Sequence, residues 1–425
     1  MQPPTARETT MTAPHTRTPV LLNWPAVPAW RIGGQIWLDR KFKDGVDISC
    51  DQWPGRIRVV MEVAELAQVP SFGAYRWTGS DERFDLALIE AGQHFSREHL
   101  AGVDILVASA DSPGKRIAPA LCREAGVACV TTIEYTLATR LDMLAHAPMT
   151  RVKRFKTLVW LLMNEWRLRA TLRRSDSIQA NGLPAFNQYA RSRPGNLLYF
   201  DTRLPAASVI AEPDLERRID AMQSGAPLRM AFSGRLIAGK GADALIPLAS
   251  RLKRLGLRFR LDIYGSGDLE PAIAAGIVAE GLADQVTLHG PVDFATALMP
   301  TLKQQVDLFI CCHRQGDPSC TYAETAGCGV PIVGFANESL KSLVEGYGIG
   351  WVVPMDALDA LAALVARLDG NRADVADRSR AARRFGMTHS FESTFQQRND
   401  HCLDVVGRRR AAPAGVQAAA ADVRA

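Results

Sequence analysis

The sequence lacks any apolar run of the roughly 18 residues that a membrane-spanning helix needs. Residues 1–17 are polar and proline-rich, with no hydrophobic segment of signal-peptide length, and we predict a disordered tail there. These absences argue against a secreted or membrane-spanning protein. We therefore expect a cytoplasmic protein that is at most peripheral, on the cytoplasmic face of a membrane.

The sequence also lacks the residue spacings that are typical of metal sites and of redox-active cysteine pairs. The 8 cysteines include no CxxC pair, and no group of cysteine, histidine and carboxylate residues has the spacing of a metal site. Cys311, Cys320 and Cys328 fall in segments that we expect to be buried or to line a site. A reducing compartment and no metal are the simpler interpretations. No Ser-His-Asp or Cys-His arrangement indicates a catalytic nucleophile.

The net charge is small for a protein that binds nucleic acid. A formal charge of +5 and a pI near 8.8 suit an anionic ligand or an acidic lipid surface, so we expect no nucleic-acid partner. The dinucleotide-binding GxGxxG motif is absent, because Gly265-Ser-Gly267 is too short a match.

The chain does have the length and alternation of a two-domain α/β protein. Its 425 residues, 47% of them hydrophobic, can bury two cores, since domains run about 100 to 200 residues. Short, nearly uncharged apolar segments alternate with helical patterns, which predicts doubly wound parallel sheets. The predicted strands are residues 19–23, 57–63, 104–109, 127–132 and 177–180, followed by 229–232, 258–264, 285–288, 308–312, 330–334 and 350–353.

Changes in composition along the chain predict the domain boundaries. We predict a first domain at residues 18–205, a charged and weakly patterned linker at 206–227, and a second domain at 228–385. A helix should follow at 386–407 and a disordered tail at 408–425. Within the first domain, residues 35–51 have helical patterning.

One strand and helix in the second domain form a predicted anion site. Asp307 to Cys312 should be a buried parallel strand, and a helix should run from Ser319, as its N-cap, to Cys328. The helix start would then lie at the carboxyl edge of a sheet, where a diphosphate binds. Glu324 lies just over a turn into the helix, where its carboxylate can accept hydrogen bonds from a sugar or ribose hydroxyl.

A second part of this site is predicted in the loop after residues 229–232. Gly234, Arg235 and Lys240 fall in this glycine-containing loop, before a helical pattern. A planar arginine fork and a lysine point charge suit a diphosphate. The alternative is that Arg235 and Lys240 are a solvated loop pair.

Three segments in order resemble one known family: Gly-Arg-Leu to Lys-Gly at 234–241, Val-Thr-Leu-His-Gly at 286–290, and Glu324 to Pro331. Together they resemble the donor-binding domain of retaining glycosyltransferases of the GT-B fold, family 4, over residues 228–385. The resemblance implies two Rossmann-like domains that face each other across a cleft. It also implies that the helix at 386–407 packs back on the first domain.

The resemblance further implies a nucleotide diphosphate sugar as donor, with no cofactor and no metal required. Arg235, Lys240 and the helix start at 319–322 would stabilise the charge of the departing diphosphate. The residues expected to bind the donor are Gly234, Arg235, Lys240, His289, Ser319, Cys320, Thr321, Tyr322 and Glu324.

The chain departs from the family at one position of the motif. In the family pattern two glutamates flank seven residues, and the second, here Glu324, binds the nucleotide ribose. The first corresponds to Gly316, with Asp317 one residue later. Either Asp317 takes over the contact to a sugar hydroxyl, or the donor sugar is held differently. Asp317 could also be only a turn former before Pro318, and Glu324 could be structural if it has a partner.

The acceptor side is predicted in the first domain. Gly33 and Gly34 stand where a strand should lead into a helix, and the family commonly has a glycine-rich loop there, although a tight turn explains such a pair equally well. Asn181 ends the strand at 177–180, where a turn or a close approach to a ligand is expected. Many relatives have a histidine or aspartate near the position of Glu134, facing the sugar.

Glu134 could therefore orient a substrate hydroxyl or stabilise positive charge that develops on the sugar. The alternative is a loop glutamate in water or paired with Arg140. The predicted catalytic residues are Glu134, Asp317, Arg235 and Lys240. His289 could contact phosphate or sugar, or could only satisfy turn carbonyls.

Residues 151–174 are strongly basic. Their cations surround an apolar core at 158–163, Glu165 is the only acid, and Trp166 lies beside it. Such a segment can lie in an anionic membrane interface, and the acceptor would then be lipid-linked. The alternative is an ordinary helix with a solvated basic face.

We therefore expect an enzyme of EC class 2.4, a retaining hexosyltransferase-type glycosyltransferase. It would move a sugar from a nucleotide diphosphate sugar to a glycan or lipid-linked acceptor in cell-surface polysaccharide or glycolipid synthesis. Two alternatives stay open. One is a catalytically silent sugar-nucleotide-binding subunit that supports a partner transferase, which the missing first glutamate favours. The other is a sugar-nucleotide epimerase of the same fold.

Overall fold

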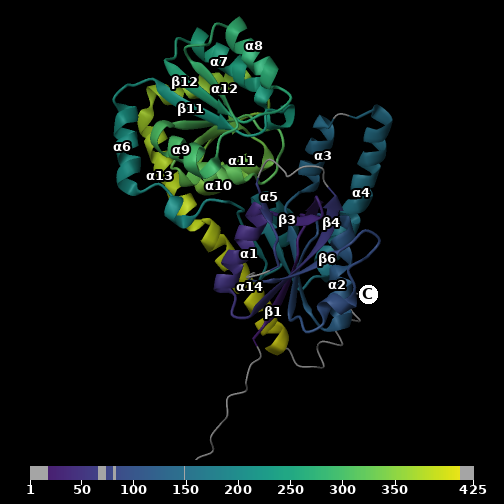
Figure 1. Cartoon of the computed structure of the whole chain (residues 1–425). Helices are drawn as coiled ribbons and strands as arrows, with labels where there is room; N and C mark the ends of the chain where they lie inside the picture. Colours follow the sequence, from purple (N-terminus) through teal and green to yellow (C-terminus); the bar gives the residue numbers. More distant parts are fainter. Residues whose placement is uncertain (1–17, 66–72, 80–82, 148, 412–425) are drawn as a thin grey trace, which may run out of the picture.

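The computed structural model describes residues 18–65, 73–79, 83–147 and 149–411 (Figure 1). Residues 1–17 and 412–425 of the two predicted tails lie outside the described residues. The chain forms two α/β domains, each built on its own sheet.

The strands are β1 Val20–Trp24, β2 Ala29–Ile32, β3 Gln35–Asp39, β4 Arg56–Glu65, β5 Ala74–Arg76, β6 Asp85–Ile89, β7 Ile105–Ser109, β8 Ala128–Ile133, β9 Ser177–Asn181, β10 Leu197–Tyr199, β11 Leu228–Ser233, β12 Phe259–Tyr264, β13 Val286–Gly290, β14 Leu308–Cys311, β15 Ile332–Phe335 and β16 Gly350–Val353. The helices are α1 Arg40–Gln52, α2 Ala118–Ala125, α3 Leu137–His146, α4 Arg151–Arg174, α5 Leu183–Ala185, α6 Glu212–Gln223, α7 Leu245–Arg254, α8 Glu270–Ala279, α9 Met299–Gln305, α10 Cys320–Gly327, α11 Glu338–Tyr347, α12 Leu358–Gly370, α13 Arg372–Thr388 and α14 Phe391–Ala411. Short helical turns are η1 Arg97–Leu100, η2 Pro113–Ile117, η3 Phe186–Ala190, η4 Ala206–Ser208, η5 Ala238–Lys240, η6 Ala242–Ala244 and η7 Phe294–Leu298.

The first domain is built on a sheet in the order β10-β9-β8-β7-β1-β4-β2-β3-β5, with β6 paired to β4. Neighbouring strands from β10 to β4 are parallel, and their apolar side chains are buried on both faces. Five predicted strands are confirmed as β1, β4, β7, β8 and β9. The chain leaves β1 in one direction toward β4 and in the other toward β7, so a switch point lies between β1 and β7.

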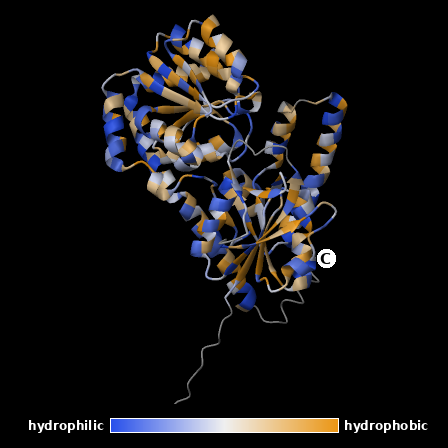
Figure 2. Cartoon of the chain, in the orientation of Figure 1, coloured by the Kyte–Doolittle hydropathy of each residue, from blue (hydrophilic) through white to orange (hydrophobic). Residues whose placement is uncertain are grey.

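The second domain has the order β13-β12-β11-β14-β15-β16, with every neighbouring pair parallel. Its six predicted strands are confirmed as β11 to β16 within a few residues. Figure 2 shows the strands of both sheets as hydrophobic along most of their length, as expected where helices cover both faces. Here the switch point, which is the usual ligand crevice of such sheets, lies between β11 and β14.

The prediction of a helix over residues 35–51 is wrong at its start. Gly33 and Gly34, with φ of 58° and 77°, form the exposed turn of the antiparallel hairpin β2–β3, and the helix begins only at Arg40. Two successive residues with positive φ match the twist of a tight hairpin, and glycine adopts them without strain. The tight-turn explanation therefore accounts for this pair.

The predicted linker at 206–227 is in large part a packed helix. Within α6, Leu215, Ile219 and Met222 are buried in the core of the second domain. Arg218 is buried with them, and its guanidinium donates to the carbonyls of Leu302, Lys303, Cys328 and Gly329. The charged residues made this segment resemble a solvated linker. The charge of Arg218 is instead buried and bound within the second domain.

A long helical pair joins the two domains. In the second domain α13 lies against α10 so closely that a Cβ on Gly386 would come 2.4 Å from the Cα of Gly327. After Thr388 the chain continues as α14, which packs on α1 in the first domain (Figure 1). There the Nδ2 of Asn399 donates to Oε1 of Gln52 at 3.1 Å.

The predicted disorder from residue 408 is wrong for residues 408–411, which continue α14. Arg409 pairs with Asp176 at 3.0 Å and Arg410 with Asp104 at 2.8 Å, both in the first domain. The basic run therefore serves as the last turn of a helix, where cations also complement the helix dipole. Among the described residues, no helix combines the length and the apolar composition needed to cross a membrane.

We predict that Arg218→Ala destabilises the second domain by about 2–4 kcal/mol, because it leaves four buried carbonyls without their donor. The control is Arg217→Ala on the same helix, whose side chain is 77% exposed and pairs only with Asp214. That variant should change the free energy of unfolding by less than about 0.5 kcal/mol. Urea unfolding of the two variants measures the difference, and equal midpoints would contradict this account.

Candidate functional site

The loops after β11 and β14 meet at the switch point of the second sheet. Lys240, at the end of η5, is 7% exposed, and its Nζ lies 2.9 Å from Oδ2 of Asp317. A buried ammonium requires a partner, and this carboxylate supplies it. The structure therefore brings together two of the residues that the sequence predicts to be catalytic.

The start of α10 lies directly after this ion pair. Ser319 is the N-cap residue of this helix, as predicted, although its side chain makes no capping hydrogen bond. Cys320 and Thr321 are in the first turn, whose N–H groups have no acceptor within the helix. The side chain of Tyr322 instead points into the core, where its hydroxyl accepts from Nδ2 of Asn337 at 3.1 Å.

Glu324 is buried one turn further along α10 and has a partner. Nε of Arg203 donates to its Oε1 at 2.9 Å, and the guanidinium of Arg203 also lies 4.2 Å from the centre of the Phe294 ring. Arg203 follows β10, at the end of the first domain, and nothing in the sequence pattern singles it out. A carboxylate has about four lone-pair sites, so this ion pair leaves Glu324 able to accept further hydrogen bonds.

Arg235, His289 and Gly234 are not part of the Lys240–Asp317 pair. Arg235 is exposed, and its side chain makes no ion pair or hydrogen bond to another described residue. The ring of His289 stacks on Tyr264, and its Nε2 lies 2.7 Å from Oδ1 of Asp262. Gly234 has a φ of 153°, a conformation that side chains rarely adopt.

Gly316, which stands at the family's first glutamate, lies in a contact between the two domains. The hydroxyl of Thr139, from α3, donates to its carbonyl at 3.2 Å, and the hydroxyl of Ser339 donates to the same carbonyl at 2.6 Å. A Cβ added at Gly316 would meet Glu338 and Thr139 at 3.2 Å. Glu338 in turn accepts from the hydroxyl of Thr136 at 2.6 Å. Side chains of both domains therefore fill the space that a glutamate would need.

The first domain has a cavity of about 440 Å³ at its own switch point. Glu134 lies in it, half-buried, after β8. Burial, reinforced by the charges of Asp201 and Asp111, raises the pKa of Glu134 to about 7, against the opposing effects of Lys41 and a hydrogen bond from Asn181. The lining residues are Asn23, Trp24, Pro25, Ala26, Val27, Asp39, Lys41, Phe42, Val46, Val107, Ala108, Ser109, Asp111, Thr132, Glu134, Tyr135, Tyr199, Asp201, Phe391, Phe395 and Arg398.

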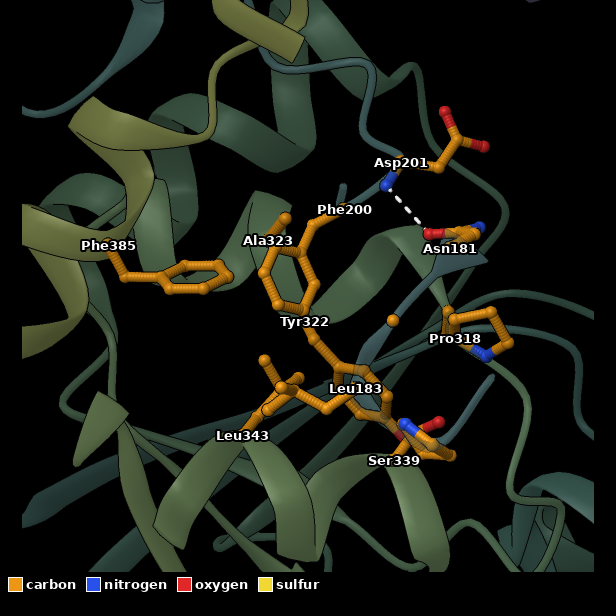
Figure 3. Close-up of a pocket in the computed structure, with 13 residues that line it drawn as sticks. Asn181, Leu183, Phe200, Asp201, Pro318, Tyr322, Ala323, Ser339, Leu343 and Phe385 are labelled. Atoms are coloured by element: carbon orange, nitrogen blue, oxygen red, sulfur yellow. Dashed lines mark hydrogen bonds between the residues drawn. The ribbon is translucent and has the colours of Figure 1, made fainter. Parts of the chain in front are cut away.

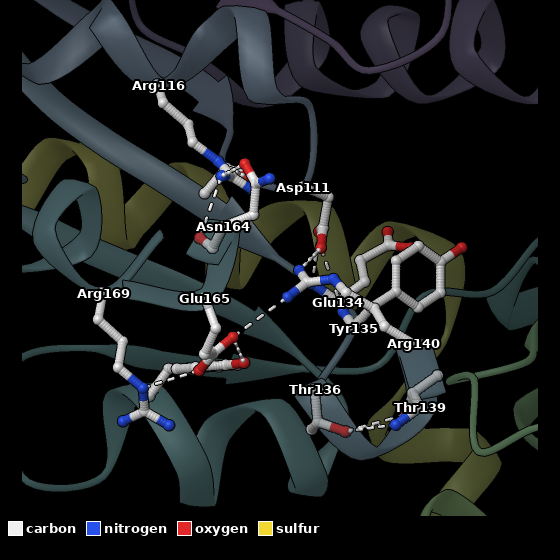
Figure 4. A network of polar contacts seen from close by, with 12 residues as sticks. Asp111, Arg116, Glu134, Tyr135, Thr136, Thr139, Arg140, Asn164, Glu165 and Arg169 are labelled. Atoms are coloured by element: carbon white, nitrogen blue, oxygen red, sulfur yellow. Dashed lines mark hydrogen bonds and ion pairs between the residues drawn. The ribbon is translucent and has the colours of Figure 1, made fainter. Parts of the chain in front are cut away.

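The suggested pairing of Glu134 with Arg140 is absent. Arg140 instead binds Asp111 at 2.7 Å and Glu165 at 3.4 Å, while the backbone N–H of Glu134 donates to Asp111 at 2.8 Å (Figure 4). The carboxylate of Glu134 instead belongs to the lining of the cavity and has a hydrogen bond from Asn181.

A lysine that the sequence analysis missed joins the two domains. Nζ of Lys41, in α1, forms an ion pair with Asp201 and donates to Sγ of Cys320, at the start of α10, at 2.9 Å. Burial, with the charge of Asp201, raises the pKa of the Cys320 thiol to about 12, so the sulfur is a neutral acceptor here. Lys41 lies in the first turn of α1 between Arg40 and Lys43, and no spacing distinguishes it from them.

Asn181 lies beside a small, largely apolar cavity between the domains (Figure 3). Its Oδ1 accepts from the backbone N–H of Asp201 at 3.0 Å. A Cβ on the neighbouring Gly182, with φ of 84°, would come 3.1 Å from Cβ of Pro318. The backbone is closely approached at this turn by the loop of the second domain that precedes α10.

Apart from Gly234, Arg235 and His289, the predicted residues divide into three groups. Lys240, Asp317 and the start of α10, with Glu324 behind it, form a site on the second domain. Glu134 and Asn181 face it from the first domain, connected through Lys41, Asp201 and Cys320. Gly33 and Gly34 lie in an exposed hairpin apart from both cavities. Among the described residues, no three histidine, cysteine or carboxylate side chains are grouped so that they could hold a metal ion.

Comparisons with known proteins identify the second domain. Residues 227–371 match the family model for group 1 glycosyl transferases. The chain is 30% identical over 171 residues to the amylovoran biosynthesis glycosyltransferase AmsK of Erwinia amylovora, covering 37% of this chain and 40% of that protein. It is 29% identical over 150 residues to the putative colanic acid biosynthesis glycosyltransferase WcaL of Salmonella typhimurium, covering 33% and 36%. The matched regions thus span well under half the length of these relatives.

Solved structures show a similar arrangement over nearly the whole chain. HepE from Anabaena, in a crystal structure that holds UDP, aligns with a TM-score of 0.62 at 12% identity, covering 91% of this chain and 99% of that one. At this identity the likeness shows the fold, which is the GT-B arrangement of two Rossmann-like domains.

We predict that Glu134→Gln changes how stability depends on pH. The carboxyl ionises near pH 4.5 in the unfolded chain and near 7 in the folded protein, so rising pH in this window favours the unfolded chain. The wild type should therefore lose up to about 3 kcal/mol that the variant keeps. Melting temperatures measured from pH 4.5 to 8 test this, with the exposed Glu345→Gln as control. Parallel curves for wild type and Glu134→Gln would contradict the raised pKa.

Proposed function

We propose that this chain, whose residues 227–371 form a group 1 glycosyl transferase domain within a GT-B fold, is a retaining hexosyltransferase. It would transfer a sugar from a nucleotide diphosphate sugar to a glycan or lipid-linked acceptor, in cell-surface polysaccharide or glycolipid synthesis, on the cytoplasmic side of a membrane. The two biosynthetic glycosyltransferases among its relatives support this class of reaction.

The observation that carries the proposal is the arrangement at the switch point of the second sheet. A buried lysine, a helix start and a buried carboxylate lie along one short stretch, from Lys240 and Asp317 to Glu324. This combination suits a nucleoside diphosphate, since the cation and the helix dipole attract the phosphates and the carboxylate accepts from ribose hydroxyls.

The same groups would promote departure of the diphosphate. Negative charge grows on the leaving phosphate oxygens as the bond to the sugar breaks, and Lys240 and the N–H groups of the α10 start stabilise it in place. The exposed Arg235 is free to close on the phosphates. Asp317 holds Lys240 in position and is close enough to the same point to accept from a sugar hydroxyl.

We place the acceptor in the cavity of the first domain. Its aromatic lining, which includes Trp24, Tyr135 and Tyr199, suits the faces of a sugar ring, and its carboxylates suit hydroxyl donors. Glu134, with a pKa of about 7, is present in both protonation states near neutral pH. We infer that Glu134 orients the attacking hydroxyl of the acceptor. Asn181 would hold the carboxylate of Glu134 in position.

A second candidate function is a catalytically silent subunit that binds a sugar nucleotide and supports a partner transferase. The observation that favours it is Gly316, where Thr139 and Glu338 occupy the space of the family's first glutamate. In that case the donor nucleotide would bind at α10 without turnover.

We predict that Lys240→Ala and Glu324→Ala each lower kcat/KM for release of the nucleotide diphosphate about 10²–10³-fold, because each removes a group that binds the donor. The control is Arg251→Ala, which removes a cation of the same domain that pairs with Asp359 at its surface. Hydrolysis or transfer is followed with the nucleotide sugar that most raises the melting temperature in a panel, since a ligand of the folded state stabilises it.

Two results would contradict the proposal. If no nucleotide or nucleotide sugar raises the melting temperature, the site does not bind a donor. If one binds, and the wild type shows neither hydrolysis nor transfer with glycan and lipid-linked acceptors, the silent subunit is the correct function.

A further inference from the structure

The most conspicuous surface outside the candidate site is one face of α4. Of the 14 large hydrophobic side chains exposed in the described part of the chain, seven lie on this helix. Phe155 is 67% exposed and Trp166 is 70% exposed, values typical of polar surface residues. The seven residues are Val152, Phe155, Val159, Trp160, Leu162, Met163 and Trp166.

Most of these side chains form one stripe along the helix. Successive residues of an α-helix are rotated by about 100°, so Val152, Phe155, Val159, Met163 and Trp166 fall on the same side. The side that packs on the domain is the opposite one, and its buried residues are Leu161, Asn164, Glu165, Leu168, Thr171 and Leu172. We call the outward set Val152, Phe155, Val159, Leu162, Met163 and Trp166 the apolar stripe.

Cations border the apolar stripe on both sides. Arg151 and Arg169 lie along one edge by helical position, and Lys156, Arg167 and Arg174 along the other, all exposed. The only acid of α4 is Glu165, which is buried and bound by Arg140 and Arg169. The surface of this helix therefore presents an apolar strip between two rows of positive charge.

We propose that α4 docks on an anionic membrane surface, lying parallel to it with the apolar stripe inserted between the headgroups. The apolar stripe, from Val152 to Trp166, gives a contact about 21 Å long. Aromatic and aliphatic side chains gain free energy by leaving water at this depth, and each flanking cation gains about 1 kcal/mol near anionic lipid. The apolar outward centre of the helix supports this proposal over the alternative of a solvated basic face.

Charge complementarity selects the membrane over a second copy of the chain. Pairing two α4 helices face to face would bring rows of arginine and lysine against each other, and α4 offers no exposed carboxylate to neutralise them. A lipid surface offers negative charge on both sides of an apolar strip, which matches the pattern over the length of the apolar stripe.

Ion pairs connect the docked helix to the acceptor cavity. Glu165, on the buried side of α4, binds Arg140 of α3, and Arg140 binds Asp111 (Figure 4). Asp111 accepts the backbone N–H groups of Glu134 and Tyr135, and all three residues line the cavity. Docking of α4 would therefore fix the cavity close to the membrane. This step rests on the proposed function, and it assigns the acceptor to lipid-linked saccharides.

The test is binding to vesicles that contain phosphatidylglycerol, compared with vesicles of phosphatidylcholine alone. We expect the full chain to sediment with the anionic vesicles and to be released by salt. The triple variant Phe155→Ser, Met163→Ser, Trp166→Ser should bind at least about tenfold more weakly to both kinds of vesicle, because it removes the inserted side chains. Neutralising four of the flanking cations, Arg151, Lys156, Arg167 and Arg174, should remove most of the preference for anionic lipid and leave binding to phosphatidylcholine vesicles unchanged.

The matched control is the triple variant Leu255→Ser, Val278→Ser, Met387→Ser, which removes three equally exposed apolar side chains from the second domain. It should bind vesicles as the wild type does. All variants change exposed side chains away from the candidate site, so their melting temperatures and their release of nucleotide from the donor in solution should stay unchanged. Loss of vesicle binding is thus separable from failure of the proposed function.

Two outcomes would overturn the docking proposal. One is a wild type that stays in the supernatant with anionic vesicles at low salt. The other is a wild type that forms dimers in sedimentation velocity and becomes monomeric in the Phe155, Met163, Trp166 variant, which would make the apolar stripe an interface between copies. In either case an unchanged release of nucleotide would leave the proposed transferase intact.

Discussion

Burial of charge between two facing sheet edges is the constraint on which the rest of this structure depends. Parallel strands deliver their carboxyl ends to one edge of each sheet, and the GT-B arrangement brings the polar groups of both edges out of bulk water. Two of these buried charges are paired with groups of opposite sign, Lys240 with Asp317 and Glu324 with Arg203. A nucleoside diphosphate would enter a set of charges that are already positioned.

Features that depend on a short stretch of sequence could be predicted from it, whereas features that depend on distant residues could not. Buried parallel strands are short, nearly uncharged runs, and those of both sheets were predicted within a few residues. The hairpin around Gly33 and Gly34 was missed because two glycines before a helical pattern also suit a strand-to-helix loop. Lys240 and Glu324 were singled out because they lie in loops and helices that follow strand ends, and Asp317 because it follows Gly316 in the segment that resembles the family. Arg203 and Lys41 were missed, because their roles depend on a partner more than a hundred residues away.

Helix α4 shows a different limit of sequence patterns. Both of its faces are apolar, one toward the domain and one toward solvent, so the hydrophobic periodicity that normally identifies the buried face nearly cancels. The sequence showed basic residues around an apolar core but gave no indication of which side faced outward. Only the packing of Leu161, Leu168 and Leu172 on the first domain identifies the outward apolar side.

The contact between Gly386 and Gly327 has a consequence for how the domains can move. With no side chain between them, α10 and α13 pack at backbone distance, and a side chain at Gly386 would force the two helices apart. The continuation of α13 is anchored in the first domain as α14. The chain crosses between the domains at two places, between β10 and α6 and at His389 and Ser390, and a swing of one domain against the other would bend it there. These residues would then act as a hinge, and the start of α10 would move together with the second domain.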